Sequence, residues 1–357
     1  MVLLQKFPTP FEHIWAKVIS VLRANPDCAK SSIIRGSREP DWAMEALNSP
    51  VGKLAQALMK DSQKEGVEAG KGFPPAWVRR VDELLPLEGD LRRHALVMFA
   101  FNLNWFFAFD PGWTETQLIS VLDEDGHDQS ALWAGFFLAA TVPDHPLYMV
   151  LKPRLLRLAK RQSMIQHNHA EVLAAILLAG WGSVDKATGE RCVTDVEMRD
   201  ILVNADDDFR SRTLWQLQRW SSKRQAGEES WGEKVPVFLT KVWPRQIKAK
   251  SPRITARLLD VALSNATTFP EIADFIIPLV TKSDREHLWL PDLKESAGNM
   301  VDKYPDKMLA LLSAVLPENV AVWPYDIEDV LKRIGIADPS LRKDPRLIEL
   351  KRRWNAR

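Results

Sequence analysis

Histidines, cysteines and clustered acids are the side chains of this 357-residue chain whose types could support metal binding or catalysis. His167 and Glu171 are four residues apart and would share a helix face, but one imidazole and one carboxylate do not form a metal site. His169 would point to another side of that helix. Neither Cys28 nor Cys192 has a recognisable neighbouring base. Because nucleophile-elbow, zinc-protease and phosphate-loop motifs are also absent from the sequence, we predict no catalytic, cofactor-binding or metal-binding residue.

An enzyme whose site is assembled from distant residues stays open as an alternative. It would require isolated histidines and loop acids to converge in the fold; these are His94, His127 and His145 with Asp123, Asp128 or Glu115. A second acidic group, Asp206–Asp208, begins a helix predicted over 207–223. Carboxylates are favoured at that end of a helix, so this group needs no catalytic explanation.

Basic residues gather in three runs that could contact phosphates. The runs are Lys152, Arg154, Arg157, Lys160 and Arg161; Lys241, Arg245, Lys248, Lys250, Arg253 and Arg257; and Arg342, Lys343, Arg346, Lys351, Arg352, Arg353 and Arg357. They support a nucleic-acid-binding alternative. The whole chain has 48 basic and 47 acidic residues, so its net charge of +1 gives no global field for nucleic acid. The other interpretation is that these basic residues lie on the solvent-exposed faces of the helices, where the aliphatic parts of their side chains cover apolar surface.

The elements that position these residues are predicted to be helices. Apolar side chains at steps of three and four from Leu91 to Phe109 predict a helix over 90–108. Its apolar run is too short and too polar to span a membrane. Pro74 and Pro75 predict a helix start, and Thr194 with Glu197 matches a capping box.

Short helices follow one another along the whole chain, and pairs of them recur at a spacing of roughly 30 to 45 residues. This pattern predicts an all-α fold, specifically an irregular α-solenoid of stacked helix pairs that resembles HEAT or TPR arrays. We expect one helical-repeat domain over 1–357. Glycine and charge replace apolar periodicity near 63–73 and 183–193, which suggests soft joints and sub-blocks 1–72, 73–190 and 191–357.

Fourteen tryptophans are spread along the chain, and most should be core residues. Those near predicted loops and charges are candidates for exposed anchors at a partner surface. The candidate partner-binding residues, including basic residues around the joint at Pro244, are Trp231, Trp243, Arg245, Lys248, Arg253, Trp289 and Trp323.

Four stretches together resemble the helical C-terminal region, a domain of unknown function, of bacterial sirtuin-like proteins that include anti-phage defence-associated sirtuins. They are DWAMEALNSPVGKLAQALM (41–59), WAGFFLAAT (133–141), FLTKVWPRQIKAKSPRITARLLDVAL (238–263) and WPYDIEDVLKRIGIADPSLRKDPRLIELKRRW (323–354). The resemblance implies a sensor attached to an NAD-cleaving sirtuin-like domain, which would lie outside this sequence. It assigns no catalytic residue to any position here.

Taken together, the sequence predicts a non-catalytic helical scaffold that recognises a protein partner. With the resemblance, that partner is expected to be a phage structural or assembly protein, and the sirtuin-like NADase would act in cis or in trans. We expect no cofactor and no membrane partner. Two cysteines are too few for a disulfide framework, which favours the bacterial cytoplasm.

Overall fold

A computed structural model describes residues 8–29, 40–61, 67–160, 167–185, 188–222, 231–282 and 298–357. The chain divides into two compact units, unit 1 (Met1–Arg154) and unit 2 (Leu155–Arg357). The division falls within helix α9 (His145–Lys160), between Arg154 and Leu155 and one residue beyond the internal proline Pro153. The predicted joints at 63–73 and 183–193 lie elsewhere and include residues outside the described ranges, so they stay predictions.

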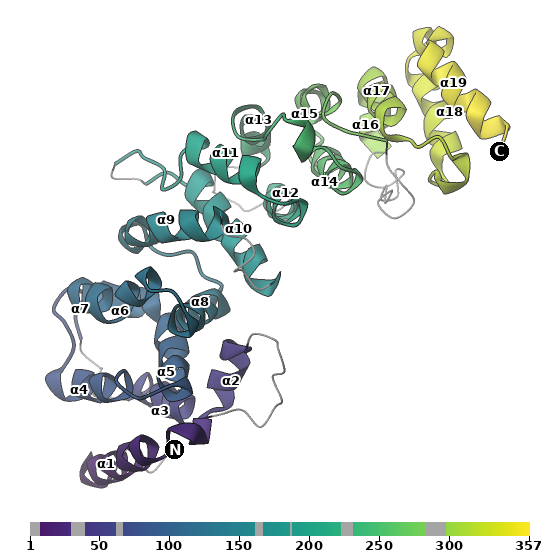
Figure 1. The fold of residues 1–357 in the computed structure, drawn as a ribbon. Helices are drawn as coiled ribbons and strands as arrows, with labels where there is room; N and C mark the ends of the chain where they lie inside the picture. The colour runs from purple at the N-terminus through teal and green to yellow at the C-terminus, as the bar shows by residue number, and fades with distance from the viewer. Residues whose placement is uncertain are drawn as a thin grey trace. The chain divides into compact units, whose positions relative to one another are not determined.

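Unit 1 consists of short helices in the part of it that is described (Figure 1). They are α1 (Pro8–Ala24), η1 (Pro26–Ala29), α2 (Trp42–Asn48), α3 (Pro50–Leu58), α4 (Pro75–Leu84), α5 (Asp90–Phe101), α6 (Leu103–Phe109), α7 (Pro111–Gln117), η3 (Ile119–Asp123), α8 (His127–Ala139) and α9 (His145–Lys160), which continues into unit 2.

Helix α5 is the centre of unit 1 and packs against α2, α3 and α8. The approach to α8 is closest at Gly135, where an added Cβ would lie 2.1 Å from the carbonyl oxygen of Val97. Large apolar side chains fill the remaining space, including the fully buried Trp77 and Phe99. The unit therefore has its own apolar core, with a glycine that permits backbone contact between its two central helices.

Unit 2 continues the chain as further helices. They are α10 (His167–Gly182), α11 (Asp195–Asn204), α12 (Asp207–Ser221), α13 (Trp231–Lys241), η5 (Ile247–Ala249), α14 (Pro252–Leu263), α15 (Phe269–Ile276), α16 (Gly298–Lys303), α17 (Pro305–Val315), η6 (Val320–Val322), α18 (Ile327–Ala337), η7 (Pro339–Lys343) and α19 (Pro345–Asn355).

The helices of unit 2 pack mainly on the next helix in the chain and on the one after it. Helix α12 contacts α10, α13 and α14, and α17 contacts α15, α16, α18 and α19. Figure 1 shows the same succession from α10 to α19. Such neighbour-to-neighbour packing is what helical repeats produce. The described residues thus have a repeat-like helical arrangement; its assignment as a solenoid stays an interpretation.

Local signals in the sequence located several helix starts correctly. The Thr194 hydroxyl accepts a hydrogen bond from the Glu197 backbone, while the Glu197 carboxylate accepts one from the Thr194 backbone, which completes the predicted capping box. Pro75 occupies the first turn of α4. The single helix predicted over 90–108 is wrong, because Asn102, at φ −106° and ψ 21°, separates α5 from α6.

The all-α fold is confirmed for the described residues, which contain no strand and one isolated antiparallel bridge, between Val184 and Arg191. Among those same residues, no helix combines the length and the apolar composition needed to cross a bilayer.

Candidate partner-binding surface

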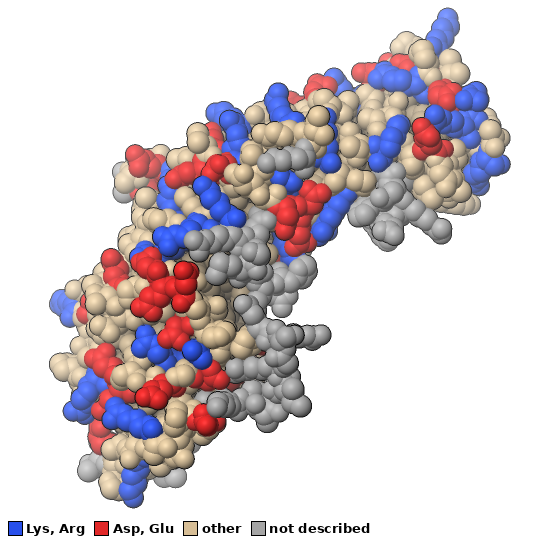
Figure 2. Space-filling view, viewed as in Figure 1, with Lys and Arg blue, Asp and Glu red and all other residues tan. Residues whose placement is uncertain are grey.

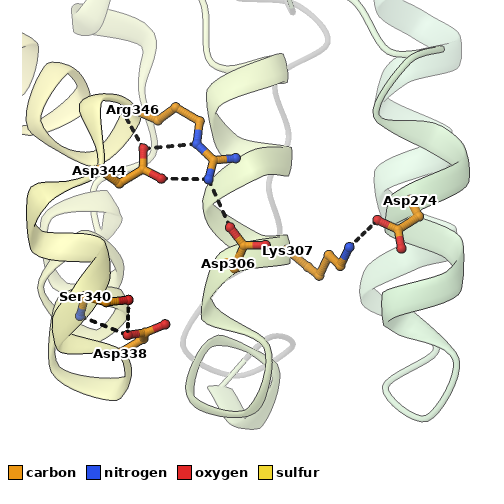
Figure 3. Close-up of polar contacts among 7 residues, drawn as sticks. All are labelled: Asp274, Asp306, Lys307, Asp338, Ser340, Asp344 and Arg346. Carbon is orange, nitrogen blue, oxygen red and sulfur yellow. Dashed lines mark hydrogen bonds and ion pairs between the residues drawn. The ribbon is translucent and has the colours of Figure 1, made fainter.

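Ion pairs connect alternate helices of unit 2, from α15 to α17 and from α17 to α19 (Figure 3). Lys307 on α17 binds Asp274 on α15. On the same helix, Asp306 accepts a hydrogen bond of 2.9 Å from the guanidinium of Arg346 on α19. Arg346 also binds Asp344, directly before that helix, at 2.8 Å. A row of charges therefore runs from α15 through α17 to α19.

A second row connects α10, α12 and α14. Arg253 of α14 and Arg212 of α12 both bind the Asp208 carboxylate, and Arg212 also lies 3.7 Å from Glu171 on α10. Burial by itself raises the pKa of Asp208, but the hydrogen bonds and charges of Arg212 and Arg253 outweigh burial and hold that pKa below its ordinary value. Asp208 is thus stabilised as the anion that joins two helices.

Most basic residues of the third run, 342–357, and several of the second have partners within unit 2. Lys250 donates to the Pro278 carbonyl, Arg257 binds Asp260, and Arg352 and Arg353 both bind Glu349. These two arginines lower the pKa of Glu349 to about 2. Figure 2 shows acidic and basic side chains interspersed over the face of unit 2 in view. Many side chains of the second and third runs therefore already have partners within unit 2, several of them on the same helix.

The connection between α13 and α14, residues 242–251, is fixed at both ends. Trp243 is only 3% exposed; its backbone N–H donates to the Phe238 carbonyl at 3.0 Å and its indole packs near the Phe238 ring. At the other end Ala249 is buried, and its N–H donates to the Gln246 carbonyl at 2.9 Å. Buried anchors on both sides restrict the conformations of the residues between them.

Two side chains project from this fixed connection. Ile247 is 83% exposed, which makes it one of the most exposed large apolar side chains among the described residues. Arg245 is also exposed, and its guanidinium lies 4.9 Å from the centre of the Phe275 ring on α15. The connection thus presents an apolar side chain and a cation two residues apart, which can bind an apolar group and an anion together.

The expectation that Trp243 and Trp323 are exposed anchors is wrong, since they are 3% and 6% exposed. The Trp323 indole N–H donates to the Pro317 carbonyl at 2.9 Å, and its ring stacks on Trp354. A buried indole N–H needs an internal acceptor, which the Pro317 carbonyl supplies for Trp323.

Trp231 is half-buried rather than exposed. Its ring packs on Gly182 of α10 and lies 4.7 Å from the ring of Trp220 on α12, while the Lys234 ammonium lies 5.1 Å above it. The absence of a side chain at position 182 makes room for this indole. Trp231 therefore joins α13 to α10 and α12.

The remaining predicted residues differ in their surroundings. Arg245 is exposed as expected, and Arg253 is 46% exposed but binds Asp208. The Lys248 side chain and the whole of Trp289 lie outside the described residues. Sequence reasoning missed Ile247 and Phe275. The available signal for Ile247 was an isolated apolar residue among polar ones between two helix boundaries.

Two acidic residues of the alternative assembled enzyme site form ion pairs within unit 1. Asp128 binds Arg92 and Arg93, and Asp123 binds Arg154. His94 is buried, with its Nε2 3.8 Å from the Glu45 carboxylate. Across the described ranges, no three histidine, cysteine or acidic side chains gather closely enough to hold a metal ion.

Comparison with known proteins gives one informative similarity. The chain is 22% identical over 331 residues to an uncharacterised protein, y4cA, of Sinorhizobium fredii (strain NBRC 101917 / NGR234). The match covers 88% of this chain and spans only 27% of the length of that relative. No protein-family model and no solved structure matches the chain.

Proposed function

We propose that this chain is a recognition module of packed helices whose unit 2 binds a protein partner. The observation that carries the proposal is the fixed α13–α14 connection, which presents the exposed Ile247 beside Arg245. An apolar side chain and an arginine held on a rigid backbone are typical of residues that contribute strongly to protein interfaces.

Nucleic-acid binding has less support. Contacts to phosphate depend on basic side chains, and many of those in the basic runs of unit 2 already bind carboxylates or carbonyls within the unit. Each would have to exchange an internal partner for a phosphate. Exposed Ile247 would add nothing to such binding.

The resemblance to the C-terminal region of sirtuin-like defence proteins supports a more specific proposal. In it, the partner is a phage structural or assembly protein, and binding controls an NAD-cleaving domain in cis or in trans. Binding would do so by differential affinity for two conformations of the module. The relative has most of its length outside the matched region, and this longer architecture is compatible with an attached domain.

The test is affinity capture of the tagged chain from bacteria before and after phage infection, with and without nuclease, followed by mass spectrometry. A stoichiometric phage protein that is captured only after infection and retained at high salt is the expected result. Capture of a host protein alone would contradict the phage-sensing part. Co-purification of nucleic acid alone, removed by nuclease, would contradict protein recognition and support the alternative.

A further inference from the structure

All charged residues in and around the α13–α14 connection are basic. From Lys234 to Leu259 the sequence contains no acidic residue, while it contains seven basic ones. Two of them, Arg253 and Arg257, are occupied by Asp208 and Asp260. Lys241 and Arg245 are exposed at the start of the connection. The local field around Ile247 therefore favours an anionic partner.

Among the described residues of unit 2, no acidic group forms an ion pair with Arg245. On the neighbouring helix α15, Asp274 binds Lys307, and Glu271 is exposed one turn before Phe275. Within the described part of the chain, no carboxylate forms an ion pair with the Arg245 guanidinium, whose contact is the Phe275 ring. A guanidinium that lies on an aromatic ring keeps its edge N–H groups available for a carboxylate.

Ile247 provides an exposed apolar side chain close in sequence to Arg245. Its neighbours Gln246 and Arg245 are exposed, whereas Trp243 and Ala249 are buried, so the isoleucine side chain is held outward by a backbone that is already ordered. Lys250 adds to this order through its hydrogen bond of 2.7 Å to the Pro278 carbonyl, beyond the end of α15. Binding at such a site loses little conformational entropy.

We propose that the surface formed by Arg245, Ile247 and Phe275 binds an acidic segment of a protein partner, with an apolar side chain of the partner against Ile247 and a neighbouring carboxylate against Arg245. The proposal rests on the proposed function and specifies where and by what chemistry the partner is recognised.

The experiment is selection of a ribosome-displayed random-peptide library on the full chain. The enriched peptides are then synthesised with a fluorescent label, and their affinity is measured by anisotropy. We expect acidic residues beside bulky apolar ones in the enriched peptides. Ile247→Asp and Arg245→Glu should each weaken binding by about tenfold or more. Affinity should also fall with rising salt, because the charge pair is at the surface.

Matched control variants exist within unit 2. Val196 on α11 is 73% exposed, and Arg219 on α12 lies 5.3 Å from the Trp215 ring, so they reproduce the exposure of Ile247 and the stacking of Arg245. Val196→Asp and Arg219→Glu should leave affinity within about twofold. A peptide whose carboxylates are replaced by lysine should bind Arg245→Glu better than it binds the unmodified chain.

Three results would overturn the proposal: no enriched peptide, enriched peptides without acidic residues, or equal binding to Ile247→Asp and the unmodified chain. Affinity capture from infected cells distinguishes a failure of this proposed surface from a failure of the proposed protein-recognition function. A protein partner retained equally by the unmodified chain and by Ile247→Asp would leave protein recognition standing and exclude this surface. Loss of all protein capture by the unmodified chain would contradict the broader function itself.

Discussion

Asp306 and Lys307 are consecutive residues in the first turn of α17, and their side chains bind helices on opposite sides of it. Asp306 binds Arg346 of α19, whereas Lys307 binds Asp274 of α15. The first turn of one helix thereby joins three helices. The pairs span 40 and 33 residues of sequence, which corresponds to the spacing of the helix pairs.

Replacing Lys307 by alanine should have a small effect on stability. Both members of the pair are partly exposed, with 35% and 58% of the side chains accessible, so the pair is screened by solvent. We expect a loss of about 0.5 kcal/mol at low salt that disappears at high salt. Chemical denaturation measures it, with Lys241→Ala as the control at an exposed lysine. A loss well above that value at high salt would contradict the screened-pair interpretation.

Trp243→Ala should destabilise unit 2 strongly, because the indole is buried against Phe238, which itself packs on Trp181 of α10. Removal of a buried aromatic ring typically costs about 3–5 kcal/mol. Arg245→Ala, two residues further on, should change stability by less than about 0.5 kcal/mol. Thermal unfolding compares the two variants. Equal stability of both would show that Trp243 is not a core residue.

Gly135→Ala should force α5 and α8 apart. The new Cβ would lie 2.1 Å from the Val97 oxygen and 2.7 Å from its Cα, and both are backbone atoms that cannot move aside as a flexible side chain could. We expect a loss of about 1–3 kcal/mol. Gly112→Ala is the matched control, since its nearest neighbour would be the Asp110 carboxylate at 3.8 Å and alanine favours a helix. A melting temperature unchanged by Gly135→Ala would contradict this packing.

Acidic pH should weaken the ion pair between Asp208 of α12 and Arg253 of α14. Because Arg212 and Arg253 hold the pKa of Asp208 below its ordinary value, the folded state binds this proton less readily than the unfolded state does. The stabilisation is complete above the unfolded pKa of about 3.9 and is lost as pH falls through the lower folded pKa. Unfolding measured between neutral and acidic pH should show a shallower acid dependence for Asp208→Asn. Identical slopes for the two proteins would exclude this contribution.

Much of the fold could be predicted because its signals are local. The capping box of Thr194 and Glu197 and the proline in the first turn of α4 involve residues within one helical turn. The break at Asn102 was not predictable from apolar periodicity, since the stripe continues through it. There the amide side chain bonds the Met98 carbonyl at 2.9 Å, where α5 ends.

The candidate surface was predictable in part. The basic residues around Pro244, including Arg245, indicated this stretch as a candidate. Which of its side chains are exposed depends on the packing of helices that are far apart in the sequence. Trp323 is covered by Trp354, 31 residues further along, and Arg253 is occupied by Asp208, 45 residues earlier. Neither partner is marked by a local pattern. The same tertiary packing leaves Ile247 uncovered.

The contact between Trp220 and Trp231 makes the junction of α12 and α13 visible to spectroscopy. Two indole rings with centres 4.7 Å apart and planes inclined by 56° share their electronic excitation. Such coupling gives a paired positive and negative circular dichroism band whose amplitude depends on ring separation and angle. Other tryptophan pairs would contribute similar bands, namely Trp77 with Trp105 and Trp323 with Trp354. The part of the signal that a Trp220→Phe variant removes therefore reports on this junction without an added dye.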